Sequence, residues 1–264
     1  MPNRTLTLIK AILFCLVCAI TFAAFSGLTK NSGTAWKDHL SLAIAIIITY
    51  GLVILFAKWQ KLNLINVGII PGKAFFKKIT AGFCIGLLMT ALQPALVFIM
   101  GHYSIAVTPG TSYNVIFFYL TLYILVALRE ELAFRSYPLF SLHYRFRLWP
   151  AQLIILVIFS AEHIAGGMTP LQAFLGAGTG ALLFGLAAIK TKGIALPVAL
   201  HTAWNFGQWC FGFKKETGLL HGITEKGFED AVERNAWISY LIIMAIVIVV
   251  FYFYKPYKSN SVQN

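Results

Sequence analysis

Long apolar segments are the feature that most restricts how this chain can fold. A helix needs about 20 mostly apolar residues to cross the roughly 30 Å hydrocarbon core of a bilayer. Eight segments of the 264-residue sequence approach that length, and they cover approximately residues 8–28, 40–57, 79–100, 114–135, 149–166, 171–189, 193–213 and 236–254. The sequence therefore predicts an all-α, polytopic integral membrane protein with about eight transmembrane helices.

The composition supports a single membrane domain spanning residues 1–264. Hydrophobic residues make up 59% of the chain, charged residues make up 11%, and the mean hydropathy is +0.77. Soluble domains carry about 25% charged residues. No polar stretch between the apolar segments is long enough to form a second folded domain, so we expect one domain.

The positions of the basic residues predict the orientation of these segments. If the N-terminus is cytoplasmic, 15 of the 21 lysines and arginines fall on the cytoplasmic side, as the positive-inside rule requires. An even number of spans then places the C-terminus on the same side. The net charge of +12 is therefore explained by membrane topology, and nucleic acid is excluded as a partner. Short loops and the lack of an organelle-targeting segment favour a prokaryotic cell membrane.

Two further patterns give local expectations. The long outer segment at residues 214–236 mixes both signs of charge, which predicts a solvated and partly helical loop. Gly176 and Gly180 have the Gly-x-x-x-Gly spacing of closely packed membrane helices, which predicts tight packing in the sixth span.

The fourth span ends in "REELAFR", which places charges against an apolar helix. Glu131 and Arg135 are four residues apart on one helix face, with the acid before the base, so Arg135 is expected to neutralise Glu131. Glu130 points about 100° away and stays available for chemistry. Counted back from the predicted end of the helix, Glu130 lies about 11 Å from the cytoplasmic side.

Two other spans repeat this four-residue spacing of polar or aromatic partners. Phe159 and His163 lie in "FSAEH" on the fifth span, and His201 and Asn205 lie in "HTAWN" on the seventh. Each pair alone is explained by a helix-end anchor or an interhelical hydrogen bond. Polar groups inside a membrane are costly and usually functional, so three such clusters in one chain favour a functional site.

These side chains suit hydrolysis of an acyl bond within the membrane. Glu130 and His163 could hold and deprotonate water, while His201 and Asn205 could donate hydrogen bonds to the developing oxyanion. The same four residues, Glu130, His163, His201 and Asn205, could alternatively bind Zn²⁺. We favour the metal-free version because the sequence has no His-Glu-x-x-His motif and asparagine is a poor zinc ligand. Glu162 is an alternative base, but we expect it to pair with a neighbouring span or to face the outer interface.

The three motifs resemble those of the CPBP family of CAAX proteases and bacteriocin-processing enzymes, also called the Abi family. "EELAFR", "FSAEH" and "HTAWN" are similar in order and interval to its Glu-Glu-x-x-x-Arg, Phe-x-x-x-His and His-x-x-x-Asn motifs, over residues 113–210. The resemblance implies an intramembrane endopeptidase whose cavity opens to the cytoplasm. It implies catalytic roles for Glu130, His163, His201 and Asn205. It also implies that three further residues support the site: Glu131, Arg135 and Phe159.

The resemblance leaves the substrate and two alternative functions open. Members of this family act on prenylated C-a-a-X proteins, and in a prokaryote the substrate could be a peptide precursor or another membrane protein. The family also includes members with suspected immunity or scaffold roles that need no catalysis. A proton or ion pathway is a third possibility, because buried glutamate and histidine also form relays.

Overall fold

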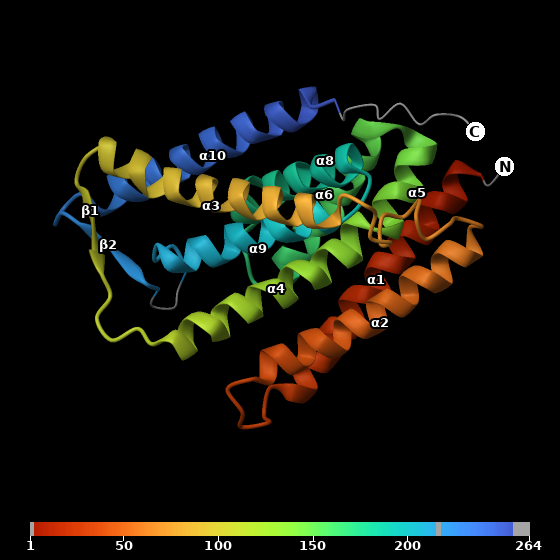
Figure 1. The fold of residues 1–264 in the computed structure, drawn as a ribbon, viewed down its shortest axis with the longest axis horizontal. Coiled ribbons are helices and arrows are strands. Elements are labelled where there is room, and N and C mark those ends of the chain that lie inside the picture. Colours follow the sequence, from red (N-terminus) through yellow and green to blue (C-terminus); the bar gives the residue numbers. More distant parts are fainter. Residues whose placement is uncertain (1–2, 215–217, 256–264) are drawn as a thin grey trace.

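The computed structural model describes residues 3–214 and 218–255, and helices dominate the fold (Figure 1). The first half of the chain forms α1 (Arg4–Thr29), α2 (Lys37–Trp59), α3 (Phe75–Ile99), β1 (Tyr103–Val107), α4 (Tyr113–Arg135) and α5 (Tyr137–Phe146). The second half forms α6 (Leu148–Ala165), α7 (Pro170–Gln172), the π-helix η1 (Ala173–Gly178), α8 (Thr179–Thr191), α9 (Ala195–Cys210), β2 (Leu220–Thr224) and α10 (Glu229–Phe253).

Six helical segments of the described chain are long and apolar enough to cross a membrane. They are α1, α2, α3, α6, the continuous run from α7 to α8, and α10. Helices α4 and α9, predicted as the fourth and seventh spans, do not meet that criterion. Helix α9 has only 16 residues, which corresponds to about 24 Å. The last seven residues of α4 include four charged side chains. The multi-pass helical membrane protein is therefore confirmed, whereas eight full spans stay a prediction.

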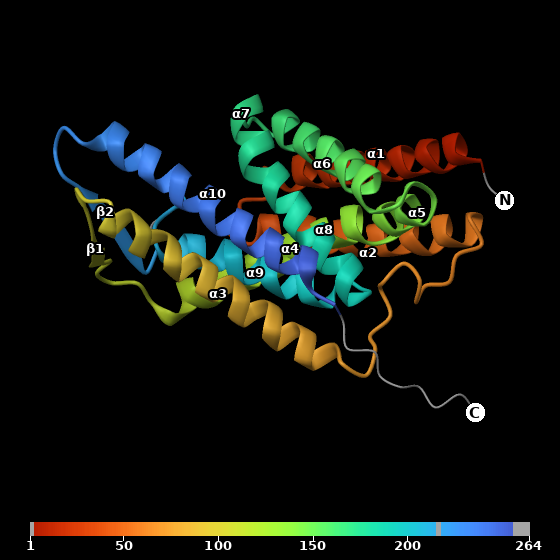
Figure 2. The same cartoon turned by 90° about the horizontal axis from the view of Figure 1, so that it is seen from above.

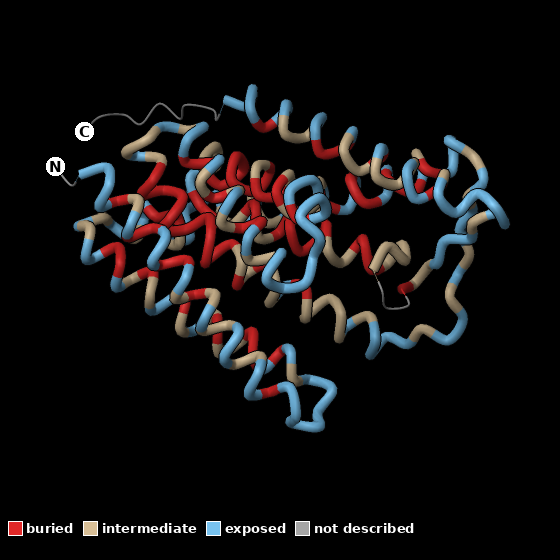
Figure 3. Tube along the Cα trace, turned by 180° about the vertical axis from the view of Figure 1, so that it is seen from behind, coloured by how far each residue is buried: buried red, intermediate tan, exposed pale blue. Residues whose placement is uncertain are grey.

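The two more polar helices lie inside the bundle. Helix α9 packs against α3, α4 and α8, and α4 also packs against α2. Helices α1 and α2 cover one side, whereas α10 covers the other side against α3 and α8 (Figure 1). Buried residues are concentrated in the middle of this arrangement (Figure 3). The surrounding apolar helices therefore shield the charges of α4 from lipid, which is the environment that such charges need.

Helix α4 ends inside the protein. After Ser136 the chain turns directly into α5, and the first six residues of α5, 137–142, are all buried. The distance of Glu130 from the cytoplasmic side, which is counted from the end of this helix, stays a prediction.

A two-stranded sheet, formed by strands far apart in the sequence, includes part of the predicted outer loop. Strand β2 pairs antiparallel with β1, with Tyr103 opposite Thr224 and Val107 opposite Leu220. The expectation of a solvated, partly helical segment is confirmed, because residues 221–223 are exposed and residues 229–236 belong to α10. The strand at residues 220–224 was not expected, and it means that the chain is not purely α-helical. Residues 215–217 of the same segment lie outside the described residues. The sheet lies at one end of the molecule, opposite the first and last described residues (Figures 1 and 2).

Close helix packing occurs between α3 and α9 rather than at the predicted glycine pair. A Cβ atom on Gly86 would lie 2.6 Å from the carbonyl oxygen of Leu200 and 2.7 Å from the Cβ of Ala203. On Gly176 and Gly180, the nearest atoms would be 3.7 and 3.5 Å away, which is ordinary contact. The small face of α3 thus brings α9 close, and this contact helps to position the polar residues of α9.

Candidate active site

The three sequence motifs meet at one cavity with a volume of about 850 Å³. Its walls include Glu130 from α4, His163 from α6, and both His201 and Asn205 from α9. Phe159 also lines this cavity. Side chains from three separate helices therefore face a common space that can hold a peptide segment.

The two adjacent glutamates of α4 face different environments. The side chain of Glu130 is 15% exposed and borders the cavity, whereas that of Glu131 is fully buried. Successive residues of a helix point about 100° apart, so one carboxylate can face the cavity while its neighbour faces the protein interior. This is the division that the sequence predicts for the pair.

His201 is held by contacts with two elements, α4 and α8. Its Nδ1–H donates to Glu131 Oε1 at 2.9 Å, and the same carboxylate oxygen lies 3.4 Å from Arg135 Nη1. The ring of Phe184 stacks on the imidazole with a centroid distance of 4.4 Å. Because Nδ1 is engaged, Nε2 is the nitrogen left for chemistry, and it lies 3.9 Å from Glu130 Oε2.

Phe159 links the buried arginine to the second histidine. Its ring centroid lies 4.3 Å from the guanidinium carbon of Arg135, which is a cation–π distance. Its carbonyl oxygen accepts a hydrogen bond of 2.9 Å from Nδ1–H of His163. That bond fixes the tautomer of His163 and leaves Nε2 as the nitrogen that can accept a proton.

Asn205 has its side-chain orientation set by a lysine from the following loop. Lys214 Nζ donates to Asn205 Oδ1 at 3.2 Å, and both residues line the cavity. An ammonium group can only donate, so it selects the amide oxygen and turns the Nδ2 donors away from itself. The amide nitrogen of Asn205 is therefore the group that can serve an oxyanion.

The remaining acid of the motif region is paired elsewhere. Glu162 forms an ion pair with Arg129, whose guanidinium also lies 4.4 Å from the ring centroid of Phe22. The expectation that Glu162 pairs with a neighbouring helix is confirmed. Glu162 does not line the cavity, whereas Glu130 of α4 and Glu233 of α10 do.

The cavity walls combine seven aromatic side chains with several polar ones. The aromatic lining comes from five helices and one loop and comprises Tyr123, Phe159, Phe184, Trp204, Phe213, Trp237 and Tyr240. Gln93 and Gln208 form a buried pair in which Gln208 Nε2 donates to Gln93 Oε1 at 2.6 Å. Such a lining suits an apolar ligand with a small number of polar groups.

Loop residues line the cavity at only one end of the bundle. They are Gly166, Gly167 and Met168 between α6 and α7, and Phe213 and Lys214 after α9. These loops lie toward the end of the molecule that carries the β1–β2 sheet, away from the first and last described residues (Figures 1 and 2). The mouth of the cavity and the chain ends are therefore on opposite sides.

The predicted zinc ligands do not form a metal-ligand cluster in this arrangement. Among residues 3–214 and 218–255, no three histidine, cysteine, aspartate or glutamate side chains are grouped closely enough to hold a metal ion. Glu131 and Phe159 accept hydrogen bonds from Nδ1–H of the two histidines, which leaves Nε2 of each histidine toward the cavity. Because the described side chains are not grouped as a metal site, we derive no step through zinc.

Three contacts at this site have no signal in the sequence. The hydrogen bond between Glu131 and His201, the stacking of Phe184 and the position of Lys214 all join residues that are far apart or outside the motifs. Only the four-residue spacings, including the Glu131–Arg135 pair, can be recognised from the sequence, because helix geometry determines them.

Comparison with known protein families gives a match in the region that carries the three motifs. Residues 112–207 match the family model described as Type II CAAX prenyl endopeptidase Rce1-like. This match confirms the resemblance to CAAX proteases, and its limits nearly coincide with the predicted region 113–210. Among curated proteins, none matches the chain.

Proposed function

Because residues 112–207 match the family model of Type II CAAX prenyl endopeptidases, Rce1-like, we propose that this chain hydrolyses peptide bonds within the membrane. The observation that supports this most is the convergence of four polar side chains on one cavity, which are Glu130, His163, His201 and Asn205. Polar groups in such a position need a role that offsets the cost of placing them there.

Glu130 and His163 activate water in this proposal. A water molecule between them donates one hydrogen bond to the carboxylate and the other to His163 Nε2, which is the unprotonated nitrogen. Its oxygen attacks the scissile carbonyl carbon while Glu130 accepts the proton. When the C–N bond breaks, Glu130 returns that proton to the leaving amine nitrogen.

His201 and Asn205 stabilise the oxyanion that forms during this attack. The Nδ2 group of Asn205 donates one hydrogen bond, and a protonated His201 donates another from Nε2. Such donors contribute most when they are already oriented before the reaction begins. The contacts that orient them are the bond from Lys214 to Asn205 and the bond from His201 to Glu131.

We propose a membrane-proximal peptide segment as the substrate, with prenylated C-a-a-X peptides as the first class to test. The family description names prenyl endopeptidases. The aromatic walls of the cavity also suit a strongly apolar ligand.

The orientation in the membrane bears on where this substrate comes from. Most lysines and arginines fall in segments on the same side as the two termini, which favours cytoplasmic termini. This excess persists when the buried Arg129 and Arg135 are left out. With that orientation, the mouth of the cavity faces the outer side. A mouth open to the cytoplasm, which the family resemblance implies, would require both termini outside. We propose the outward-facing mouth because the charge distribution is a property of this sequence, whereas the cytoplasmic mouth is implied only by the family resemblance.

Peptide cleavage by the purified protein tests the catalytic proposal. A quenched, farnesylated C-a-a-X peptide would be incubated in detergent with the wild type, Glu130→Gln and Glu225→Gln. Glu225 is a matched control because its carboxylate is exposed and pairs with His102 away from the cavity. We expect Glu130→Gln to lose cleavage and Glu225→Gln to retain it.

Each other outcome has a defined meaning. Full activity of Glu130→Gln would contradict the proposed base. If the wild type cleaves neither this peptide nor unprenylated membrane-protein fragments, the non-catalytic immunity or scaffold function is favoured. A zinc chelator added to the wild type is expected to leave cleavage unchanged.

A further inference from the structure

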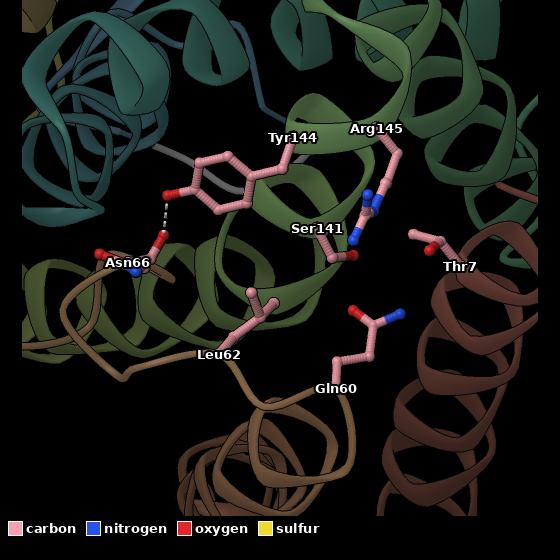
Figure 4. Close-up of a pocket in the computed structure, with 7 residues that line it drawn as sticks. All are labelled: Thr7, Gln60, Leu62, Asn66, Ser141, Tyr144 and Arg145. Atoms are coloured by element: carbon pink, nitrogen blue, oxygen red, sulfur yellow. Dashed lines mark hydrogen bonds between the residues drawn. The ribbon is translucent and has the colours of Figure 1, made fainter. Parts of the chain in front are cut away.

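A second, smaller cavity lies at the other end of the molecule (Figure 4). Its volume is about 190 Å³, and it is enclosed by α1, the end of α2 with the loop that follows it, and α5. It shares no lining residue with the large cavity. Its contents would therefore not touch the proposed catalytic residues.

Most hydroxyl groups around this cavity are already engaged as donors. Tyr144 Oη donates to the carbonyl oxygen of Asn66 at 2.8 Å, and Ser141 Oγ donates to that of Pro138 at 3.1 Å. Burial also raises the pKa of Tyr144, so this hydroxyl stays protonated. These groups form a fixed polar wall, and they leave few donors free for a ligand.

Two nitrogen-bearing side chains remain directed into the space. Gln60 Nε2 is buried without a hydrogen-bond partner within the described part of the chain. Figure 4 shows its amide and the guanidinium of Arg145 extending toward the same region. A buried donor without a partner is costly, so this site calls for an acceptor.

The surroundings determine the charge of that acceptor. The sequence contains no aspartate or glutamate between Asp38 and Glu130, or between Glu162 and Glu216. The loops at this end of the molecule, which include residues 60–74 and 192–194, are thus free of carboxylates. Lysine and arginine are abundant in the same loops. A guanidinium in such a setting binds oxyanions, often through two parallel hydrogen bonds.

The location of the cavity indicates the source of the oxyanion. Tyr144 lines the cavity and is 51% exposed. Trp59 directly precedes the lining residue Gln60 and is 55% exposed. Such exposure is expected for aromatic residues at a membrane interface. Leu62 adds an apolar surface beside the polar wall. Exposed aromatic residues beside a polar wall are typical of the depth where phospholipid phosphates and glycerol groups occur.

We propose that this cavity binds the phosphate group of an anionic phospholipid in the leaflet next to the chain ends. Arg145 and Gln60 donate hydrogen bonds to the phosphate oxygens, and the glycerol backbone lies over Leu62. A water molecule takes up about 30 Å³ of liquid, so this cavity has room for a phosphate with part of its glycerol. The proposal is independent of the peptidase function.

Thermal unfolding of the delipidated full-length protein in neutral detergent tests this site. Unfolding midpoints would be measured with phosphatidylglycerol, with phosphatidylcholine and with inorganic phosphate. We expect phosphatidylglycerol to raise the midpoint by roughly 4 °C or more at saturation. Arg145→Gln should lose most of that shift, whereas Lys73→Gln, an exposed cation outside the cavity at the same end, should keep it.

The other outcomes discriminate between sources and would overturn the proposal. An equal shift for Arg145→Gln and wild type would show that this cavity is not the binding site. An equal shift with phosphatidylcholine would contradict selection of an anionic lipid, and a full shift with inorganic phosphate would identify a free-phosphate site. If Arg145→Gln does not fold, Gln60→Leu removes the second donor, and native mass spectrometry then counts the phospholipid molecules retained per chain.

Discussion

At the scale of single residues, one buried arginine connects two parts of the candidate site. Arg135 forms an ion pair with Glu131, contacts the ring of Phe159, and is fully buried. Glu131 in turn holds His201, while Phe159 holds His163. Both proposed catalytic histidines therefore depend on the same guanidinium through one intermediate residue.

Removing this guanidinium should destabilise the protein. Arg135→Gln would leave the Glu131 carboxylate buried without a counter-charge, and breaking a buried ion pair from one side costs about 3–5 kcal/mol. The double variant Glu131→Gln/Arg135→Gln should be less destabilised than the sum of the two single variants. Denaturant unfolding in detergent measures all three, and simple additivity would contradict a direct interaction.

The amide of Asn205 provides a second test at this scale. Asn205→Ala should lower kcat by about 10² to 10³-fold with little change in KM, because the lost donor acts on the oxyanion rather than on the bound substrate. Lys214→Met should have a smaller effect on kcat, because it releases the amide without removing it. Steady-state cleavage kinetics distinguish the two. A change confined to KM would assign Asn205 to substrate binding instead.

At the scale of elements, the contact between α3 and α9 sets the position of His201 and Asn205. Gly86 lies against the backbone of α9, where a Cβ atom would approach a carbonyl oxygen to 2.6 Å. This is too close for an ordinary contact, and the neighbouring atoms belong largely to backbone, which cannot rotate away. The spacing of these helices therefore depends on the absence of a side chain.

A single methyl group at this crossing should weaken the fold. We expect Gly86→Ala to lower stability by about 1–3 kcal/mol, the range typical of an overpacked interior. Gly51→Ala on α2 is the matched control, since nothing lies within 4 Å of its added Cβ atom. Thermal unfolding of both variants in one detergent provides the comparison. Equal midpoints would mean that α3 and α9 can separate without cost.

At the scale of the whole molecule, the mouth of the large cavity and the chain ends lie on opposite sides (Figures 1 and 2). Met168 is exposed beside this mouth, whereas Lys73 is exposed at the end near the termini. These two positions therefore report which side of the membrane each end of the protein faces.

Labelling of intact cells can decide the orientation. After replacement of the four native cysteines, Met168→Cys should react with a membrane-impermeant maleimide from outside, and Lys73→Cys should react only after the cells are opened. This follows from cytoplasmic termini, which the basic loops favour. The reverse pattern would place the mouth in the cytoplasm. Because labelling does not depend on catalysis, the result stands apart from the peptidase proposal.

The sequence by itself determined the features that depend on local periodicity. Apolar length predicted the membrane helices, and four-residue spacing predicted which side chains share a helix face. The Glu131–Arg135 pair and the separate direction of Glu130 follow from helix geometry alone. The motifs also indicated the family whose model matches residues 112–207, about one third of the chain.

The tertiary structure decided everything that depends on contacts between distant segments. Only packing shows that α4 ends in the interior, that Glu131 binds His201, and that Lys214 reaches Asn205. Only packing shows on which side the cavity opens. Periodicity describes the faces of one helix, but it carries no information about which helix lies opposite, so the assembled site could not be read from the sequence.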